Sequence, residues 1–181
     1  MPTRRSILVA LGGNFPGSWG TPLETLRRAL EELGQRRVLV EAVSPFYETE
    51  AVGPAGQGAY VNAVASVQTS LPPQALLRTL KQIEAGASRR GGKPWGPRSL
   101  DLDIIDYKGL VTHWPHASKR YARAGRRPLV LPHPLAHLRP FVLRPLLDVA
   151  PDWRHPSLKR SGRDLLRTLS DDAGGRILKR L

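Results

Sequence analysis

Cysteine is absent from this sequence of 181 residues. Disulfide bonds and cysteine-ligated zinc are therefore excluded, and the fold must be stable without covalent cross-links. A chain of this length can bury a hydrophobic core as one domain, which we expect to span residues 1–181. The lack of cysteine fits the reducing cytoplasm, where we expect the protein to reside.

Long apolar runs are also missing, since no stretch approaches the roughly 20 apolar residues that a membrane-spanning helix needs. Arg4 and Arg5 precede an apolar run over residues 7–11, an arrangement that resembles a twin-arginine export signal. The run stops at Gly12, however, and no small-residue cleavage site follows it. We therefore interpret this segment as a basic edge before a first strand, and we expect no membrane partner.

Acidic residues are few compared with basic ones. The chain has 15 Asp and Glu residues against 28 Lys and Arg residues, which gives a formal net charge of +13. A chain with this charge attracts anions such as nucleotides, nucleic acid, acidic lipids or acidic proteins. The charge therefore indicates the sign of the partner but does not distinguish among these classes.

Strand and helix patterns alternate along the chain, which favours an α+β sandwich. Thr21 and Glu24 have the spacing of a capping box at the start of a helix, and Gly34 is predicted to end that helix. The predicted strands cover residues 6–11, 38–43, 60–69, 100–107 and 176–181, and the predicted helices begin at residues 22 and 72, with partly helical segments over 138–149 and 164–169.

Two aspartates in the predicted strand over residues 100–107 are the most informative feature. Side chains alternate between the two faces of a strand, so Asp101 and Asp103 point the same way, roughly 7 Å apart. Leu102 and Ile104 then face an apolar core, whereas Asp106 has the opposite parity to the pair and is not expected to join it. Carboxylates at this spacing can bind one or two Mg²⁺ ions.

A half-exposed strand with polar residues outward is the alternative interpretation of this pair. Aspartate is a poor strand former, so two aspartates in one strand favour a functional role over a merely exposed strand face. The basic Gly- and Pro-rich segment over residues 86–97 lies just before the pair. Phosphoryl transfer needs acidic ligands that hold a metal ion on the phosphates, together with arginines that stabilise the developing negative charge.

A family resemblance extends across most of the chain. The segment over residues 95–104 strongly resembles the signature of 6-hydroxymethyl-7,8-dihydropterin pyrophosphokinases, enzymes of folate biosynthesis. Separate motifs in the same order add specificity that no single motif has. These motifs are Leu11-Gly12-Gly13-Asn14, Tyr47-Glu48-Thr49, Gly53-Pro54, Tyr60-Val61-Asn62-Ala63, Gln82-Ile83-Glu84, Pro132-His133-Pro134, Arg139-Pro140-Phe141-Val142-Leu143 and Pro145-Leu146.

The resemblance implies a fold and a reaction. The fold would be a ferredoxin-like α/β sandwich with a mainly antiparallel sheet covered by helices. The enzyme would transfer diphosphate from ATP to 6-hydroxymethyl-7,8-dihydropterin and release AMP, as a Mg²⁺-dependent cytoplasmic transferase that holds two metal ions. We expect a monomer whose partners are these two small molecules, with nucleic acid not among them.

Individual roles are also implied by the resemblance. Asp101 and Asp103 would be the metal ligands. Catalytic roles fall on Arg89, Arg90, Arg98 and the aspartate pair; ATP contacts fall on Glu84, Trp95, Arg98, Ile104, His133 and Arg139; pterin contacts fall on Thr49, Val52, Tyr60, Asn62, Trp95 and Phe141.

Other features of the sequence favour different functions. A basic insert at about residues 112–127 contains Trp114 and Tyr121 among its arginines and lysines, a pattern that also suits stacking on single-stranded nucleic acid. His133 and His137 stand four residues apart, which invites a zinc site, but Pro134 interrupts the helix that such a site requires. A related kinase with a different acceptor would keep the fold and change the substrate.

Overall fold

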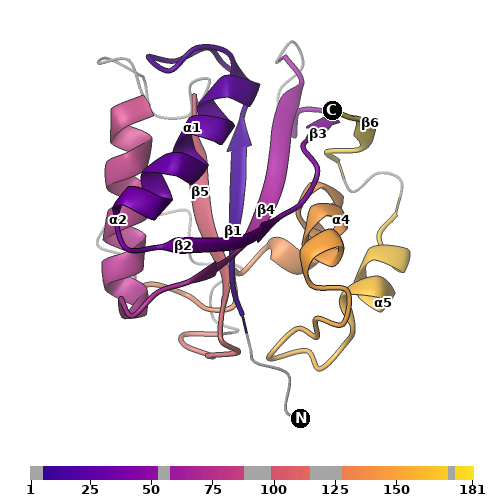
Figure 1. Ribbon diagram of the computed structural model, residues 1–181. Coiled ribbons are helices and arrows are strands. Elements are labelled where there is room, and N and C mark those ends of the chain that lie inside the picture. Colours follow the sequence, from indigo (N-terminus) through magenta and orange to yellow (C-terminus); the bar gives the residue numbers. More distant parts are fainter. Residues whose placement is uncertain (1–5, 53–57, 88–98, 115–127, 171–173) are drawn as a thin grey trace.

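The computed structural model describes residues 6–52, 58–87, 99–114, 128–170 and 174–181. Within these ranges six strands form one open sheet, in the order β5-β1-β4-β3-β6, with β2 paired to β4 beside β3. Every pairing between these strands is antiparallel. Helices lie against the sheet, as Figure 1 shows, so the α+β prediction is confirmed.

The elements follow the predicted order closely. No helix in the described parts of the chain is long and apolar enough to cross a membrane. The strands are β1 (Ile7–Gly13), β2 (Leu39–Val43), β3 (Tyr47–Thr49), β4 (Tyr60–Gln68), β5 (Asp101–Tyr107) and β6 (Ile177–Arg180). The helices are α1 (Pro22–Gln35), α2 (Pro73–Ala87), the short 3₁₀ helix η1 (Ala136–Leu138), α4 (Pro140–Val149) and α5 (Gly162–Arg167).

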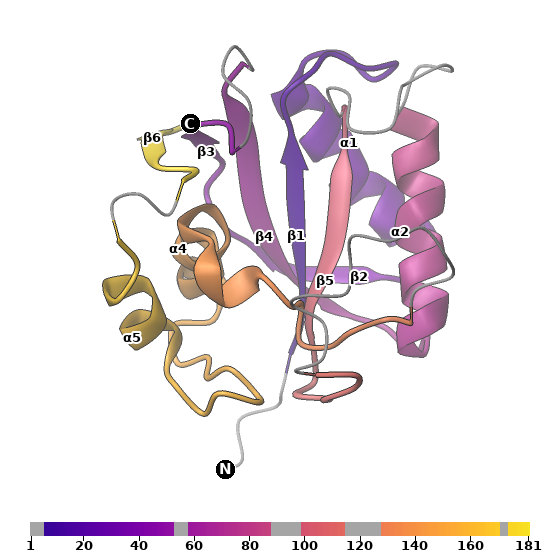
Figure 2. The same cartoon turned by 180° about the vertical axis from the view of Figure 1, so that it is seen from behind.

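Helices cover both faces of the sheet, and each face has its own apolar cluster. Alternation along β1 sends Ile7, Val9 and Leu11 into the cluster under α1 and α2, whereas Leu8 joins the cluster under α4. Helix α1 lies in front of the sheet in Figure 1, and the turned view in Figure 2 brings α4 to the front. On the face toward α4, β1 carries Leu8, Ala10 and Gly12, of which only Leu8 has a large side chain.

The start of α1 follows the sequence prediction, but its end does not. Thr21 and Glu24 form the expected capping box. Gly34 lies inside the helix, and the left-handed residue that ends it is Arg37, with φ of 62°. The Leu33 carbonyl accepts hydrogen bonds from the Arg36 and Val38 amides, and fully buried Val38 anchors this Schellman-type end. The burial of Val38 in the tertiary structure therefore determines where α1 ends.

A β-bulge in β5 overturns the expected orientation of Asp106. Leu8 pairs with Asp106 and Val9 pairs with Ile104, so Ile105 is an extra residue in β5. The bulge turns Asp106 to the same face as Asp101 and Asp103, which contradicts the parity inferred from alternation. Asp106 is nevertheless buried at the far end of the strand, where it accepts hydrogen bonds from Trp153 Nε1 at 2.7 Å and from the Gly109 amide at 2.7 Å.

A cluster of aromatic rings packs beside this buried aspartate. The His155 ring is fully buried, with ring centroids 4.9 Å from Trp114, 5.3 Å from His137 and 5.6 Å from Trp153. Its Nδ1 accepts hydrogen bonds from two backbone amides of the following turn, at 3.2 Å and 3.1 Å. A ring that accepts at Nδ1 carries its proton on Nε2 and is neutral.

This cluster predicts an acid-sensitive fold. Burial, and secondarily the nearby His137, lowers the pKa of His155 from its ordinary 6.5 to about 4. Between these values the unfolded chain binds more protons at this histidine than the folded chain does. The free energy of unfolding is therefore unaffected by His155 above pH 6.5 and falls as the pH drops from 6.5 toward 4. The loss attributable to His155 reaches up to about 3 kcal/mol.

Urea unfolding of wild type and His155→Asn at several pH values between 7 and 4 measures this effect. The asparagine keeps an acceptor for the turn amides but does not titrate. We expect a shallower loss of stability on acidification in the variant. Identical pH slopes for the two proteins would show that His155 does not cause the loss.

Candidate functional site

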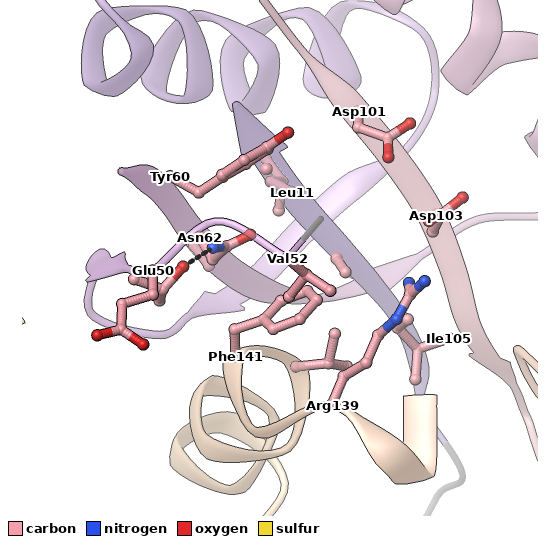
Figure 3. A pocket seen from close by; sticks show the side chains of 15 residues that line it. Leu11, Glu50, Val52, Tyr60, Asn62, Asp101, Asp103, Ile105, Arg139 and Phe141 are labelled. Carbon is pink, nitrogen blue, oxygen red and sulfur yellow. Dashed lines mark hydrogen bonds between the residues drawn. The ribbon is translucent and has the colours of Figure 1, made fainter. Parts of the chain in front are cut away.

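A cavity of about 210 Å³ opens on the sheet face that α4 partly covers. Strands β1, β3, β4 and β5 supply its floor, and the first turn of α4 supplies one wall (Figure 3). Its lining residues are Ala10, Leu11, Gly12, Thr49, Glu50, Val52, Tyr60, Asn62, Ala63, Asp101, Asp103, Ile105, Arg139, Phe141 and Val142.

The cavity exists because β1 carries small side chains where it crosses the centre of this face. Gly12 pairs with Asn62 of β4 on one side and with Asp101 of β5 on the other, and Ala10 pairs with Asp103 in the same way. A Cβ atom on Gly12 would lie 2.8 Å from Asn62 Oδ1, so a larger residue would displace this amide. The small side chains of β1 therefore leave an empty space between the polar side chain of Asn62 on β4 and the two aspartates on β5.

One end of the cavity combines an oriented amide with aromatic rings. Asn62 is 8% exposed, and its Nδ2 donates a hydrogen bond of 2.7 Å to Thr49 Oγ1. That bond fixes the amide, with Oδ1 on the side of Gly12. Tyr60 from β4 and Phe141 from α4 extend toward the same space in Figure 3. The arrangement suits a flat ligand with hydrogen-bonding groups on its edge.

The other end of the cavity carries the acidic pair. Asp101 and Asp103 project from β5 on one face, as the sequence predicts, and Leu102 and Ile104 lie in the opposite core. The Asp103 side chain is 34% exposed, so its oxygens are accessible to a ligand. Arg139, at the start of α4, extends toward Asp103 in Figure 3. Acidic and basic groups thus meet at one end of the hollow.

An arginine and a histidine border the aspartates. Burial lowers the pKa of Arg139, and the charges of Asp103 and Asp101 oppose that shift. Burial also lowers the pKa of His133, while Asp103 favours its protonated form. His133 Nδ1 accepts from the Leu135 amide at 3.2 Å, and its Nε2 lies 3.6 Å from Asp103 Oδ2. The imidazole is therefore oriented toward Asp103 and is ready to contact an anion held there.

Glu84 has a structural role that the sequence did not predict. Its Oε1 accepts a hydrogen bond of 2.7 Å from the Leu102 amide on the outer edge of β5, and one of 2.6 Å from Lys81 Nζ. Burial raises the pKa of Glu84, and Lys81 opposes the shift. This α2 side chain thus satisfies an edge-strand donor between Asp101 and Asp103, outside the lining of the cavity.

The remaining predicted site residues divide into two groups. Ile104 is 3% exposed within the core under α1 and α2, so its side chain does not face the cavity, and only its backbone could contact a nucleotide there. Arg89, Arg90, Trp95 and Arg98 lie outside the described residues, and their roles stay predictions.

The alternative readings of His137 and Trp114 gain no support from the structure. The His137 ring packs against Trp114 and His155, whereas His133 faces Asp103, so the two histidines have different surroundings. In the described part of the chain, no three His, Cys, Asp or Glu side chains gather as a metal cluster. Trp114 packs against the two imidazoles, and the remainder of the basic insert, residues 115–127, lies outside the described ranges.

Several residues that line the cavity have no motif in the sequence that marks them. Ala10 and Ile105 read as ordinary strand residues, and Glu50 follows the predicted Thr49 without a motif of its own. No signal in the sequence marks Ala10, because its place beside Asp103 depends on the register between β1 and β5. Glu50 has no signal either, because its ion pair with Arg176 joins residues 126 positions apart.

The fold and the cavity define an α+β domain whose polar ligand site lies on one face of an antiparallel sheet. The family described as 7,8-dihydro-6-hydroxymethylpterin-pyrophosphokinase (HPPK) matches residues 8–151. A Synechocystis protein named 2-amino-4-hydroxy-6-hydroxymethyldihydropteridine pyrophosphokinase is 38% identical over 90% of this chain and 73% of its own length. A Pseudomonas aeruginosa protein of the same name is 39% identical over 83% of each chain. The chain therefore belongs to the HPPK family.

Solved structures show the same fold. The crystal structure of an HPPK-DHPS in complex with substrates superposes with a TM-score of 0.63 at 14% identity, over 92% of this chain and 43% of that chain. A Plasmodium falciparum HPPK-DHPS triple mutant gives a TM-score of 0.66 at 15% identity, over 92% and 44%. This chain thus spans less than half of those longer chains, and they bear on its fold alone.

The contact between Glu84 and β5 leads to a prediction about stability. Glu84→Ala leaves the Leu102 amide without this acceptor and should lower the free energy of unfolding by about 1–3 kcal/mol. Glu84→Gln keeps an acceptor oxygen and should cost clearly less. Urea unfolding measures both, with Glu31→Ala as the control, because Glu31 is 62% exposed on α1. Equal losses for the alanine and glutamine variants would contradict the edge-pairing role.

Proposed function

We propose that this chain transfers diphosphate from ATP to the hydroxymethyl group of 6-hydroxymethyl-7,8-dihydropterin, giving AMP and the pterin diphosphate. Membership of the HPPK family assigns pyrophosphoryl transfer to this acceptor in folate biosynthesis. In that reaction the acceptor hydroxyl oxygen attacks the β-phosphorus and loses its proton, the bond between the β-phosphorus and the α–β bridging oxygen breaks, and AMP leaves with that oxygen.

The arrangement of groups in the cavity is the main support for this proposal. A single cavity holds a fixed amide with aromatic rings at one end and a carboxylate pair at the other. Asn62 and Asp101 both pair with Gly12, so two strand spacings, roughly 10 Å, separate their backbones. That separation suits an acceptor ring at the amide and phosphates at the carboxylates. Holding both substrates in this relation favours direct transfer between them.

Asp101 and Asp103 fit Mg²⁺ in the chemistry of their donors. They offer hard carboxylate oxygens on one face of β5, and Asp103 is partly exposed to the cavity. Magnesium usually takes one or two protein carboxylates and completes its shell with water and phosphate oxygens, so this pair suffices. We propose two Mg²⁺ ions here; when bound, they would neutralise negative charge on the phosphate oxygens.

The acceptor ring would bind at the amide end. Asn62 presents its amide with the orientation set by Thr49, and Tyr60 and Phe141 offer aromatic surfaces. Val52 adds an apolar side chain to the wall. An amide can donate to and accept from the edge of a pterin at once, which distinguishes this ring from purely apolar ones.

The nucleotide would lie along the acidic end. Arg139 supplies a half-buried cation, and the His133 ring faces Asp103. Arg89, Arg90, Trp95 and Arg98 remain predicted contacts, while Glu84 would act through the position of β5. We propose a cytoplasmic monomer whose partners are these two small molecules, with neither nucleic acid nor a membrane among them.

The first prediction from this proposal concerns the reaction. Wild type should release AMP from ATP and Mg²⁺ in a pterin-dependent manner, and a variant with both Asp101→Ala and Asp103→Ala should lose at least about a hundredfold in turnover. Asp152→Ala is the control, since this exposed aspartate lies beyond α4 and outside the cavity. Pterin-dependent AMP release that persists in the double variant would exclude the carboxylate pair as the metal site.

The second prediction concerns the acceptor. Asn62→Ala should raise the KM for the pterin roughly tenfold to a hundredfold, because a directional amide contact is lost, and change the KM for ATP by less than about twofold. Gln68→Ala, an exposed amide at the end of the same strand, is the control. A rise in the ATP KM that matches the rise in the pterin KM would contradict the assignment of this end to the acceptor.

A further inference from the structure

The C-terminal segment returns to the cavity although it lies beyond the family match. That match ends at residue 151, whereas β6 pairs with β3, the strand that brings Thr49 to the cavity. Figure 1 shows β6, in yellow, beside β3 and above α4. The residues just before β6, Gly174 to Arg176, therefore lie at the amide end of the site.

Two glycines in this segment make a turn that packs against the cavity wall. Gly174 and Gly175 both adopt left-handed backbone conformations, with φ of 73° and 69°. A Cβ atom on Gly175 would overlap Phe141 Cδ1, and it would lie 2.8 Å from Phe141 Cε1 and 3.2 Å from Val52 Cγ2. Only glycine combines this conformation with so close an approach to the ring.

An ion pair fastens the same segment to the rim of the cavity. Glu50 Oε1 accepts hydrogen bonds from Arg176 Nε at 3.1 Å and Nη2 at 2.6 Å. The Glu50 amide also donates to the Arg176 carbonyl at 2.9 Å. The side chains are 42% and 72% exposed, so the pair adds little stability. Its geometric effect is to fix the turn against Val52 and Phe141.

We propose that Gly175 and the Glu50–Arg176 pair are positioning residues for the acceptor ring. They hold Phe141 and Val52 where the flat substrate must pack, and they make the C-terminal segment part of the acceptor site. Val52 is 56% exposed, so the contact with the turn is an important restraint on its place. This inference rests on the proposed function, and it adds a specificity determinant that the family match does not cover.

The glycine pair offers a matched test. Gly175→Ala introduces left-handed strain and an overlap with Phe141, whereas Gly174→Ala introduces similar strain with a Cβ that meets Val52 only at 3.4 Å and beyond, an ordinary contact. We expect Gly175→Ala to raise the KM for the pterin roughly tenfold, with the ATP KM changed by less than about twofold. Gly174→Ala should give a clearly smaller rise in the pterin KM.

The ion pair offers a second test that does not depend on how well Gly175→Ala folds. Arg176→Gln should raise the pterin KM several-fold, by about threefold or more, and a charge exchange with Glu50→Arg and Arg176→Glu should restore part of the loss. Lys179→Gln is the control, because Lys179 Nζ pairs with Glu48 Oε2 at 3.3 Å in the same β3–β6 ladder. We expect its pterin KM to match wild type.

Steady-state AMP release with varied pterin and varied ATP measures all five variants against wild type. An active wild type with pterin KM values within twofold for Gly175→Ala and Arg176→Gln overturns the positioning role while leaving the proposed function intact. Equal effects of Arg176→Gln and Lys179→Gln also overturn it, since they show a general loss of β6. A wild type without pterin-dependent AMP release overturns the proposed function and this inference together.

Discussion

The antiparallel pairing of β1 with both β4 and β5 is the constraint on which the site depends. Its register places Gly12 between Asn62 and Asp101, and Ala10 between Val64 and Asp103. Because side chains alternate along a strand, the same register sends Val9 and Leu11 into the core under α1 and α2. A slip of one residue would exchange the two faces and fill the cavity with large apolar side chains.

The sheet places the charged groups and the buried amide of the site on different strands. Aspartates that would be costly inside a core lie on the strand β5 at the end of the sheet order, where Asp103 stays partly exposed beside Arg139 and His133. The amide of Asn62, by contrast, is nearly buried on β4 and is satisfied by Thr49. A buried polar group costs little free energy when a partner hydrogen-bonds to it, and a charged group costs little when water or opposite charge surrounds it.

Local patterns predicted much of the fold because they depend on residues near one another in the chain. The capping box at Thr21 was correct, as was the shared face of Asp101 and Asp103. The end of α1 was predicted wrongly at Gly34, because burial of Val38 and a left-handed Arg37 decide it. The face of Asp106 was also wrong, because alternation holds only in a strand without a bulge.

The sequence by itself determined the kinds of groups available: a carboxylate pair on a strand, an amide beside aromatic residues, an excess of positive charge and a family signature. Tertiary structure decided which of them share a cavity. In the fold, Asn62 and Asp101 lie on either side of Gly12, and Glu84 contacts the edge of β5. Arg176, near the far end of the chain, pairs with Glu50. Strand register and packing make these contacts between residues far apart in the chain, and no local spacing in the sequence encodes them.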